Sequence, residues 1–291
     1  IRRSILLIWW GDCVKKKIIS ITIDVIIWIF LLGFAAIVLV PLVFMFTASF
    51  MPSNEIMKMP YPWIPSEFRW QNYWQAIRGN DGKFLFLRSI WNSFLVASIT
   101  TIGTVFLCSL TGFGLAKYKF KGRNFVFFMI LGTLMIPFEA IMIPLYLIVT
   151  GMGMQDTYAG MIIPLLMSPF GVFMMRQYLL TFPDELLDAA RIDGASEFGI
   201  YWRVVLPNSV PAIATLSILT FRSQWDNLLW PLLIVQSPEK KTIPLFITIF
   251  VTEKYTNEGA MMAAAAPMII LFLTLTKYFL AGSEVFAATK D

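Results

Sequence analysis

The chain has no histidine among its 291 residues, and cysteine occurs only twice, as Cys13 and Cys108. Histidine is the commonest general base and metal ligand, and Ser/His or Cys/His nucleophile pairs require it. Two cysteines are too few for a disulfide framework or a zinc-binding cluster. A phosphate-binding loop of the pattern Gly-x-x-x-x-Gly-Lys-[Ser/Thr] is also missing, so we do not expect this chain to hydrolyse ATP. We predict no catalytic residue and no metal site, and a function other than that of an enzyme.

Charged residues are scarce as well, at 14% of the chain, whereas soluble domains have about 25%. Hydrophobic residues make up 58%, and the mean hydropathy is +0.72. This composition predicts an integral membrane protein. The net charge of +5 does not indicate nucleic-acid binding, because Lys and Arg occur in short groups between apolar runs, where membrane proteins carry their orientation signals.

Six stretches have the roughly 20 mostly apolar residues that a membrane-spanning helix needs. They are residues 18–49, 86–116, 124–149, 158–180, 210–235 and 261–281. Helices satisfy the backbone hydrogen bonds within one segment, as lipid requires. We therefore expect an all-α integral membrane protein with one transmembrane domain, residues 18–281.

Six spans place both ends of the chain on the same side of the membrane, and the positive-inside rule assigns that side to the cytoplasm. Basic residues on this side are Arg2, Arg3, Lys15, Lys16, Lys17, Lys117, Lys119, Lys121, Arg123, Arg191 and Arg203. The outer segments are less basic on balance, since acidic residues accompany their lysines and arginines. We expect residues 1–17 and 282–291 to be cytoplasmic.

A polar loop, residues 181–209, separates the fourth and fifth predicted spans. Pro183 suits a first helical position, and Asp184 and Glu185 favour the positive end of a helix dipole. Gly194 can take the left-handed conformation that ends such a helix, and Ser196 can cap a second one. We expect Pro207 and Pro211 to limit that second helix.

Two interpretations of this helix pair are open. It is an amphipathic segment lying on the membrane surface, or it docks a protein partner. Acidic residues outnumber basic ones, with Asp184, Glu185 and Asp188 in its first half. Anionic lipid at the cytoplasmic leaflet repels acids, so the docking interpretation is favoured.

The same stretch carries a resemblance to a known family. "LLDAARIDGASEFGIYWRVVLPNSVP" resembles the signature cytoplasmic loop of membrane subunits of ABC importers, which reads Glu-Ala-Ala, three residues, Gly, nine residues, Ile-x-Leu-Pro. Aspartate stands here where glutamate is usual, and valine where isoleucine is usual. The residues in the signature places are Asp188, Ala189, Ala190, Gly194, Val204, Leu206 and Pro207.

Further stretches are similar to the carbohydrate-importer branch of that family, and most closely to the smaller, six-span permease of maltose importers. They are "WNSFLVA" (91–97), "GFGLAKYKFKGR" (112–123), "MIPFEAIMIPLYLI" (135–148) and "QWDNLLWPL" (224–232). The final "AGSEVFAATKD" loosely resembles the tail that reaches between the two ATPases in the maltose type.

The resemblance implies a type I importer fold in a bacterial inner membrane. In that family the loop is a coupling helix that docks in a cleft of the ATPase. It implies a second homologous permease subunit, two cytoplasmic ATPase subunits that bind ATP–Mg, and a periplasmic or extracellular solute-binding protein. This chain itself would bind no cofactor. The coupling residues it implies are Glu185, Asp188, Ala189, Ala190, Asp193, Gly194, Ala195, Leu206 and Pro207.

Polar residues within the fifth predicted span are candidates for the translocation pathway, because polar groups at membrane depth usually face the bundle interior or a water-filled cavity. The candidates are Arg222, Gln224, Trp225, Asp226, Asn227 and Trp230. Indole and amide groups suit a sugar. Alternatively, Arg222 and Asp226 form an i,i+4 pair that holds the bundle together.

Two other features have two interpretations each. The outer segment 51–85, rich in proline and tryptophan, is either an interfacial anchor belt or a docking surface. Glu139, between Pro137 and Pro144, lies either at a kinked gate or, as we favour, near the outer interface.

The substrate expected from the resemblance is an oligosaccharide, with acidic ones such as alginate considered among them. Two alternatives are an importer permease for a non-sugar solute and, less favoured, an ion-coupled secondary transporter. Secondary transporters often contain inverted repeats, and none is visible here.

Overall fold

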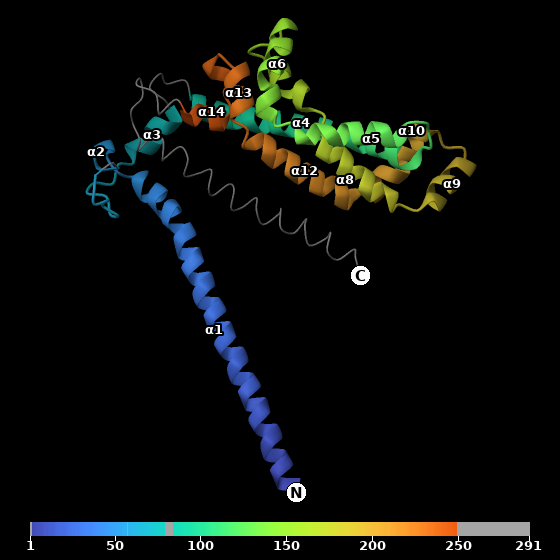
Figure 1. Ribbon diagram of the computed structural model, residues 1–291. Coiled ribbons are helices and arrows are strands. Elements are labelled where there is room, and N and C mark those ends of the chain that lie inside the picture. Colours follow the sequence, from blue (N-terminus) through green and yellow to red (C-terminus); the bar gives the residue numbers. More distant parts are fainter. Residues whose placement is uncertain (1, 57, 79–83, 249–291) are drawn as a thin grey trace.

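The computed structural model describes residues 2–56, 58–78 and 84–248, with side chains from residue 21 onward. These parts of the chain fold into helices and connecting segments (Figure 1). The sixth predicted span, 261–281, and the tail, 282–291, lie outside the described residues, as do residues 79–83 of the outer segment.

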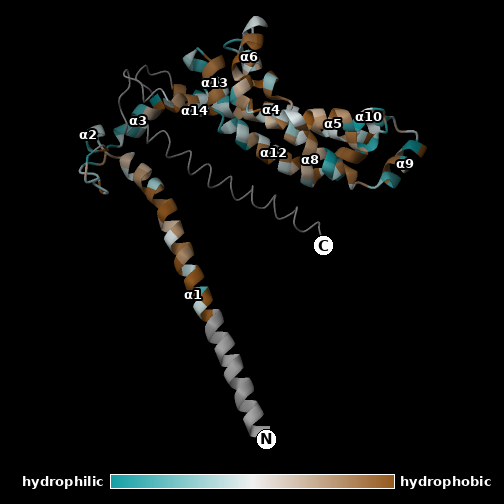
Figure 2. Cartoon of the chain, viewed as in Figure 1, coloured by the Kyte–Doolittle hydropathy of each residue, from teal (hydrophilic) through white to brown (hydrophobic). Residues whose placement is uncertain are grey.

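The first helix, α1 (Arg2–Ala48), extends away from the rest of the protein (Figure 1). At 1.5 Å per residue its 47 residues measure about 70 Å. Its stretch from Ile21 to Ala48 is mostly apolar (Figure 2), and none of its most apolar window is buried. A helix that is hydrophobic all round is typical of a membrane span.

The core of the fold is a bundle in which α4 (Leu85–Lys117) packs against both α8 (Pro169–Leu180) and α12 (Val210–Trp225). Glycines let these helices approach closely. A Cβ added at Gly112 of α4 would lie 2.8 Å from Met175 Cβ in α8. One added at Gly171 of α8 would lie 2.9 Å from Cys108 Sγ in α4. Small residues at such crossings are typical of helix packing in membranes.

The predicted third span, 124–149, is not one helix. It consists of α5 (Arg123–Gly132) with the 3₁₀ turn η1 (Thr133–Met135), and then α6 (Phe138–Gly151), bent by 102° relative to them. Pro137 cannot donate a backbone hydrogen bond and disfavours the helical conformation of the residue before it. Ile136 is accordingly extended, with φ −92° and ψ 115°.

The predicted fourth span, 158–180, is also broken. α7 (Tyr158–Ile162) and the 3₁₀ turn η2 (Ile163–Leu165) are followed by α8 at an angle of 45°. Ser168 is extended, and its side chain accepts a hydrogen bond from the Gly171 amide at 3.1 Å, so α8 begins with its own cap.

The predicted fifth span, 210–235, is likewise not continuous. α12 ends at Trp225, and a short helix, α13 (Leu229–Ile234), follows after three residues. Pro231 has no N–H to donate to the carbonyl of residue 227, which disfavours an unbroken helix here. Trp230 of α13 is fully buried.

Two described helices are long and apolar enough to cross a membrane, or five if each bent pair counts as one span. The third such pair joins residues 197–208 to α12 through a bend of 81°. The remaining elements are short. They are α2 (Ser53–Ile56), α3 (Gln71–Arg78), α9 (Asp184–Ile192), α10 (Glu197–Ile200), the π-helix η3 (Tyr201–Val205), α11 (Leu206–Asn208), the 3₁₀ turn η4 (Pro238–Lys240) and α14 (Ile243–Ile247).

Candidate functional site

The loop 181–209 forms the helix pair that its sequence predicts, at the opposite end of the bundle from α2 and α3 (Figure 1). α9 begins at Asp184, directly after Pro183, and Gly194 just beyond its end has φ +79°. The Ser196 hydroxyl accepts a hydrogen bond from the Gly199 amide at 3.2 Å. The glycine turn and the serine cap are therefore confirmed.

The second helix ends between its two predicted limits, Pro207 and Pro211. The chain remains helical from α10 through η3 into α11, and Pro207 is the second-to-last residue of this continuous helical stretch. The helix ends at Asn208. Ser209, whose hydroxyl donates to the Val205 carbonyl at 2.7 Å, then marks the 81° bend into α12.

Arg191 joins the two helices of this loop. Its Nε lies 2.9 Å from Glu197 Oε1 in α10, and its Nη1 lies 2.8 Å from Asp188 Oδ1 in α9. The hydrogen bonds from Arg191 and Tyr118 hold the pKa of Glu197 below its usual value. Asp188, the aspartate at the usual glutamate position, thus has a defined partner within the chain.

Contacts with the C-terminal end of α4 anchor the loop to the bundle. Lys117 Nζ lies 2.6 Å from Asp184 Oδ1 and also donates to the Phe182 carbonyl. Tyr118 hydrogen-bonds to Glu197, and its burial together with that carboxylate raises its pKa to about 12. The Leu187 side chain is buried in the core beneath α9. These contacts tie α9 and α10 to the end of α4.

The outward face of the loop combines apolar and acidic side chains. Ile192 is 86% exposed and Phe198 59% exposed. Phe198 stacks on Trp202 with a centroid distance of 6.4 Å. Glu185, Asp188, Ala189, Asp193, Gly194 and Pro207 are exposed, whereas Ala190, Ala195 and Leu206 are half-buried. The sequence analysis missed Ile192, Phe198 and Trp202 as surface residues, although an exposed apolar group beside a docking signature is a usable signal.

Five of the six pathway candidates lie together around the end of α12. Arg222 Nε and Asp226 Oδ2 are 3.7 Å apart, and both side chains are about three-fifths exposed. Trp225 stacks on Phe221 at 5.7 Å. An exposed ion pair with this geometry adds little stability, so this pair contributes little to holding the helix bundle together.

Gln224 and Asn227 complete this group, and Trp230 lies apart from it. The Asn227 amide side chain lies 3.5 Å from Gln224 Oε1, and Asn227 Oδ1 accepts from the Trp230 backbone N–H at 3.3 Å. The Trp230 indole is enclosed in a core cluster, where its Nε1 donates to the Gly160 carbonyl at 3.0 Å.

A polar clamp that the sequence analysis did not identify joins Asp156 to the segment after α13. Asp156 Oδ1 accepts from the amides of Gln236 and Ser237, each at 3.0 Å, and Lys240 Nζ lies 3.1 Å from Asp156 Oδ2. Burial by itself would raise the pKa of Asp156, but the hydrogen bonds from Ser237, Gln236 and Lys240 outweigh it and hold the pKa well below its usual range.

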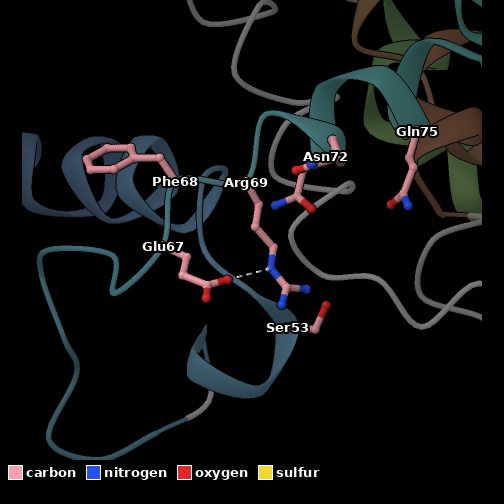
Figure 3. A pocket seen from close by; sticks show the side chains of 7 residues that line it. Ser53, Glu67, Phe68, Arg69, Asn72 and Gln75 are labelled. Carbon is pink, nitrogen blue, oxygen red and sulfur yellow. Dashed lines mark ion pairs between the residues drawn. The ribbon is translucent and has the colours of Figure 1, made fainter.

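The outer segment contains an open polar cavity of about 630 Å³ (Figure 3). Arg69 and Glu67 point toward each other at its edge, with Arg69 Nε 3.7 Å from Glu67 Oε2. The lining residues are Ser53, Glu67, Phe68, Arg69, Gln71, Asn72 and Gln75. The tryptophans at 63, 70 and 74 of the same segment are exposed. Glu139 is exposed at the start of α6, next to the Pro137 break.

Comparison with known proteins identifies the family. Residues 108–282, more than half of the chain, match the family described as the inner membrane component of binding-protein-dependent transport systems. The chain belongs to this family. This permease is therefore a transport component of the inner membrane, and its resemblance to membrane subunits of ABC importers is confirmed.

Relatives and a solved structure extend the match over most of the permease. It is 34% identical to the arabinooligosaccharides transport system permease protein AraQ of Bacillus subtilis, covering 88% of the permease and 92% of AraQ. It is 34% identical to the sn-glycerol-3-phosphate transport system permease protein UgpE of Brucella abortus, covering 84% of the permease and 90% of UgpE. A chain in the crystal structure of a bacterial ABC transporter involved in the import of the acidic polysaccharide alginate matches with a TM-score of 0.73 and 26% identity, covering 89% of the permease and 98% of that chain.

Proposed function

We propose that the permease forms half of the translocation pathway of an ATP-driven oligosaccharide importer and pairs with a second, homologous membrane subunit. The observation that carries this proposal is the exposed helix pair of loop 181–209, which is anchored to α4 and lies at one end of the bundle. The relatives support it, since AraQ is a permease for arabinooligosaccharides.

The loop is the proposed contact with the ATPase subunits. Its acidic and apolar outward face suits a protein surface rather than anionic lipid. The proposed coupling residues are Glu185, Asp188, Ala189, Ala190, Asp193, Gly194, Ala195, Leu206 and Pro207. We add Ile192, Phe198 and Trp202 because they are exposed on the same segment.

In the proposed mechanism this chain transmits motion from the ATPase subunits to its membrane spans. The ATPase partners bind ATP–Mg and carry out the hydrolysis, and this chain supplies no group to that reaction. When the partners close and open, α9 moves with them. Lys117 and Tyr118 transmit this motion to α4 through their contacts with Asp184 and Glu197. The spans then alternate between outward-open and inward-open arrangements.

The proposed pathway surface is the group at the end of α12, namely Arg222, Gln224, Trp225, Asp226 and Asn227. Charged and amide groups at this depth are favoured where they meet water or a polar solute. Trp230 is not included, because its side chain is fully buried.

The outer segment is the proposed contact with a solute-binding protein. Its polar cavity (Figure 3) and the exposed tryptophans of the same segment favour the docking interpretation over an anchor belt alone. Tryptophan and arginine are enriched in protein interfaces. We further propose six spans with both ends of the chain in the cytoplasm of a bacterium.

Reconstitution tests the function and separates the substrate alternatives. The permease, its partner subunit, the ATPases and the binding protein are placed in vesicles, and uptake of neutral oligosaccharides, alginate oligosaccharides and glycerol-3-phosphate is measured. We expect ATP-dependent uptake of an oligosaccharide. Uptake driven by a proton or sodium gradient without the ATPases would contradict the proposal and favour an ion-coupled transporter.

A further inference from the structure

The turn between α4 and α5 contains a short run in which basic and aromatic side chains are interleaved, "KFKGRNF" at residues 119–125. The run lines an open cavity of about 460 Å³. The lining residues are Lys119, Phe120, Lys121, Gly122, Arg123, Asn124 and Phe125. The turn lies at the same end of the bundle as α9 and α10 (Figure 1), since the adjoining Tyr118 contacts Glu197.

The three basic side chains of this cavity are not neutralised by the described parts of the chain. No carboxylate there lies within ion-pair distance of Lys119, Lys121 or Arg123. The charge of Asp184 acts on Lys119, but the Asp184 carboxylate is already paired with Lys117 Nζ at 2.6 Å. The cavity therefore presents an excess of positive charge.

Arg176 of α8 adds a further positive charge beside the turn. Its guanidinium lies over the Phe127 ring, 3.9 Å from the centroid, and its Nε donates to the Leu115 carbonyl at 3.3 Å. Arg123 Nη1 donates to the Tyr118 carbonyl at 3.3 Å. These contacts hold both guanidinium groups in place, although their charges repel each other. A bound anion relieves such repulsion.

Exposed phenyl rings accompany the basic side chains. Phe120 is 48% exposed, Phe125 is 70% exposed, and Phe128, further along α5, is 67% exposed. The turn follows α4, which is long and apolar enough to cross a membrane, and precedes the bent pair of α5 and α6, which passes the same test as one span. A free phosphate would gain nothing from these rings. A lipid offers an anionic headgroup to the cations and acyl chains to the rings.

We propose that residues 119–125 bind the headgroup of an anionic phospholipid, with the Phe120 and Phe125 rings against its acyl chains. The inference goes beyond the proposed function, because it concerns the membrane and not the transported solute. Basic pockets beside membrane spans bind anionic headgroups. The Arg123 guanidinium can donate two parallel N–H groups to a phosphate, and the lysines add positive charge to the same site.

The test uses the complete transporter, reconstituted in phosphatidylcholine vesicles with increasing mole fractions of a photoactivatable phosphatidylglycerol. After irradiation and proteolysis, mass spectrometry measures the lipid attached to peptides from residues 118–132. We expect saturable attachment in the wild type. Lys121→Gln should raise the half-saturating mole fraction about fivefold, the effect of one charge beside an anionic headgroup. Lys121→Arg, which keeps the charge, should stay within about twofold of the wild type.

The matched control is Arg203→Gln, which removes an exposed basic side chain from loop 181–209 that does not line the cavity. Arg203→Gln should leave the half-saturating mole fraction unchanged. The proposal is overturned if Lys121→Gln is labelled like the wild type or if Arg203→Gln is equally impaired.

Two further measurements separate an anionic lipid from other occupants. A photoactivatable phosphatidylcholine with the same acyl chains should label these peptides much less, and equal labelling would overturn recognition of the headgroup. Inorganic phosphate, added at constant ionic strength, should not displace the phosphatidylglycerol, and displacement would assign the cavity to free phosphate instead. Phe125→Gln should raise the half-saturating mole fraction as well, because the ring contact with the acyl chains is lost.

Discussion

Arg191 in α9 and Glu197 in α10 form an ion pair across the Gly194 turn, with 2.9 Å between Nε and Oε1. Arg191 also contacts Asp188, and Glu197 also contacts Tyr118 at the end of α4. The two short helices and the bundle are thereby joined through a few polar side chains. Because these side chains are partly exposed, the joint stabilises the fold only modestly but determines the orientation of α9.

Breaking this joint should impair coupling more than folding. We predict that Arg191→Gln and Glu197→Gln each reduce ATP-dependent uptake severalfold. Each should lower the free energy of unfolding of the purified complex by only about 0.3–1 kcal/mol. A double-mutant cycle on ATPase pull-down and uptake checks this, with Arg203→Gln as a control in the same loop. Strictly additive losses would show that the two residues act independently.

The turn at Gly194 predicts a graded series. Its φ of +79° disfavours residues with a Cβ, with asparagine tolerated best and β-branched residues least. We expect association with the ATPases to be strongest in the wild type and to weaken progressively in the variants Gly194→Asn, Gly194→Ala and Gly194→Val. Replacing the glycine by alanine should cost about 1–2 kcal/mol in local conformation. A Gly194→Val variant that binds the ATPases normally would show that the turn does not position the docking face.

The crossing of α4 and α8 depends on Gly112. A Cβ at this position would lie 2.8 Å from Met175 Cβ and 2.9 Å from the Arg176 backbone nitrogen. We predict that Gly112→Ala lowers the free energy of unfolding by about 1–3 kcal/mol. Gly114→Ala is the control, because nothing lies within 4 Å of a Cβ there, and alanine favours the helix. Thermal unfolding of the purified complex compares the two, and equal Tm values would contradict the close packing.

The Asp156 clamp predicts a pH dependence. The folded state lowers the pKa of Asp156, so its stabilising contribution is present above the usual aspartate pKa of about 3.9 and is lost as the pH falls below it. Asp156→Asn keeps a residue that tolerates the φ of +53° and removes the charge.

We expect Asp156→Asn to lower the stability by about 1–3 kcal/mol at neutral pH. The Tm difference from the wild type should stay constant between about pH 5 and 8 and shrink below about pH 4. Tryptophan fluorescence during thermal unfolding at several pH values measures this. A difference that grows in acid would show that the carboxylate is not held in its charged form.

Much of loop 181–209 could be predicted because its signals are local. A glycine after a short helix ends it, and a serine before the next helix caps it, whatever surrounds them. The direction of its contacts could not be predicted in this way. Asp188 faces Arg191 three residues away, but Lys117 meets Asp184 across 67 residues, and no periodicity shows such a pair.

The spans illustrate a different limit. Hydropathy is averaged over a window of residues and contains no information on the direction of the helix axis. Residues 124–149 were therefore expected to form one helix, although the two halves are bent by 102°. Pro137 indicated a break but not its angle. Trp230 shows that predicting a site from hydropathy and sequence neighbours has the same limitation. It was expected beside the polar residues of the pathway, but its ring is buried in the core, where its indole donates to the Gly160 carbonyl.

The sequence by itself determined the membrane class, the helical character, the polar loop with its glycine turn and the family resemblance, because each depends on composition or on residues close together in the chain. Only the tertiary structure decided which polar groups meet. Asp156 reaches an amide 80 residues away, and Arg176 of α8 donates to the Leu115 carbonyl of α4. Such contacts depend on how the helices bend and cross, and bending and crossing follow from packing between distant segments.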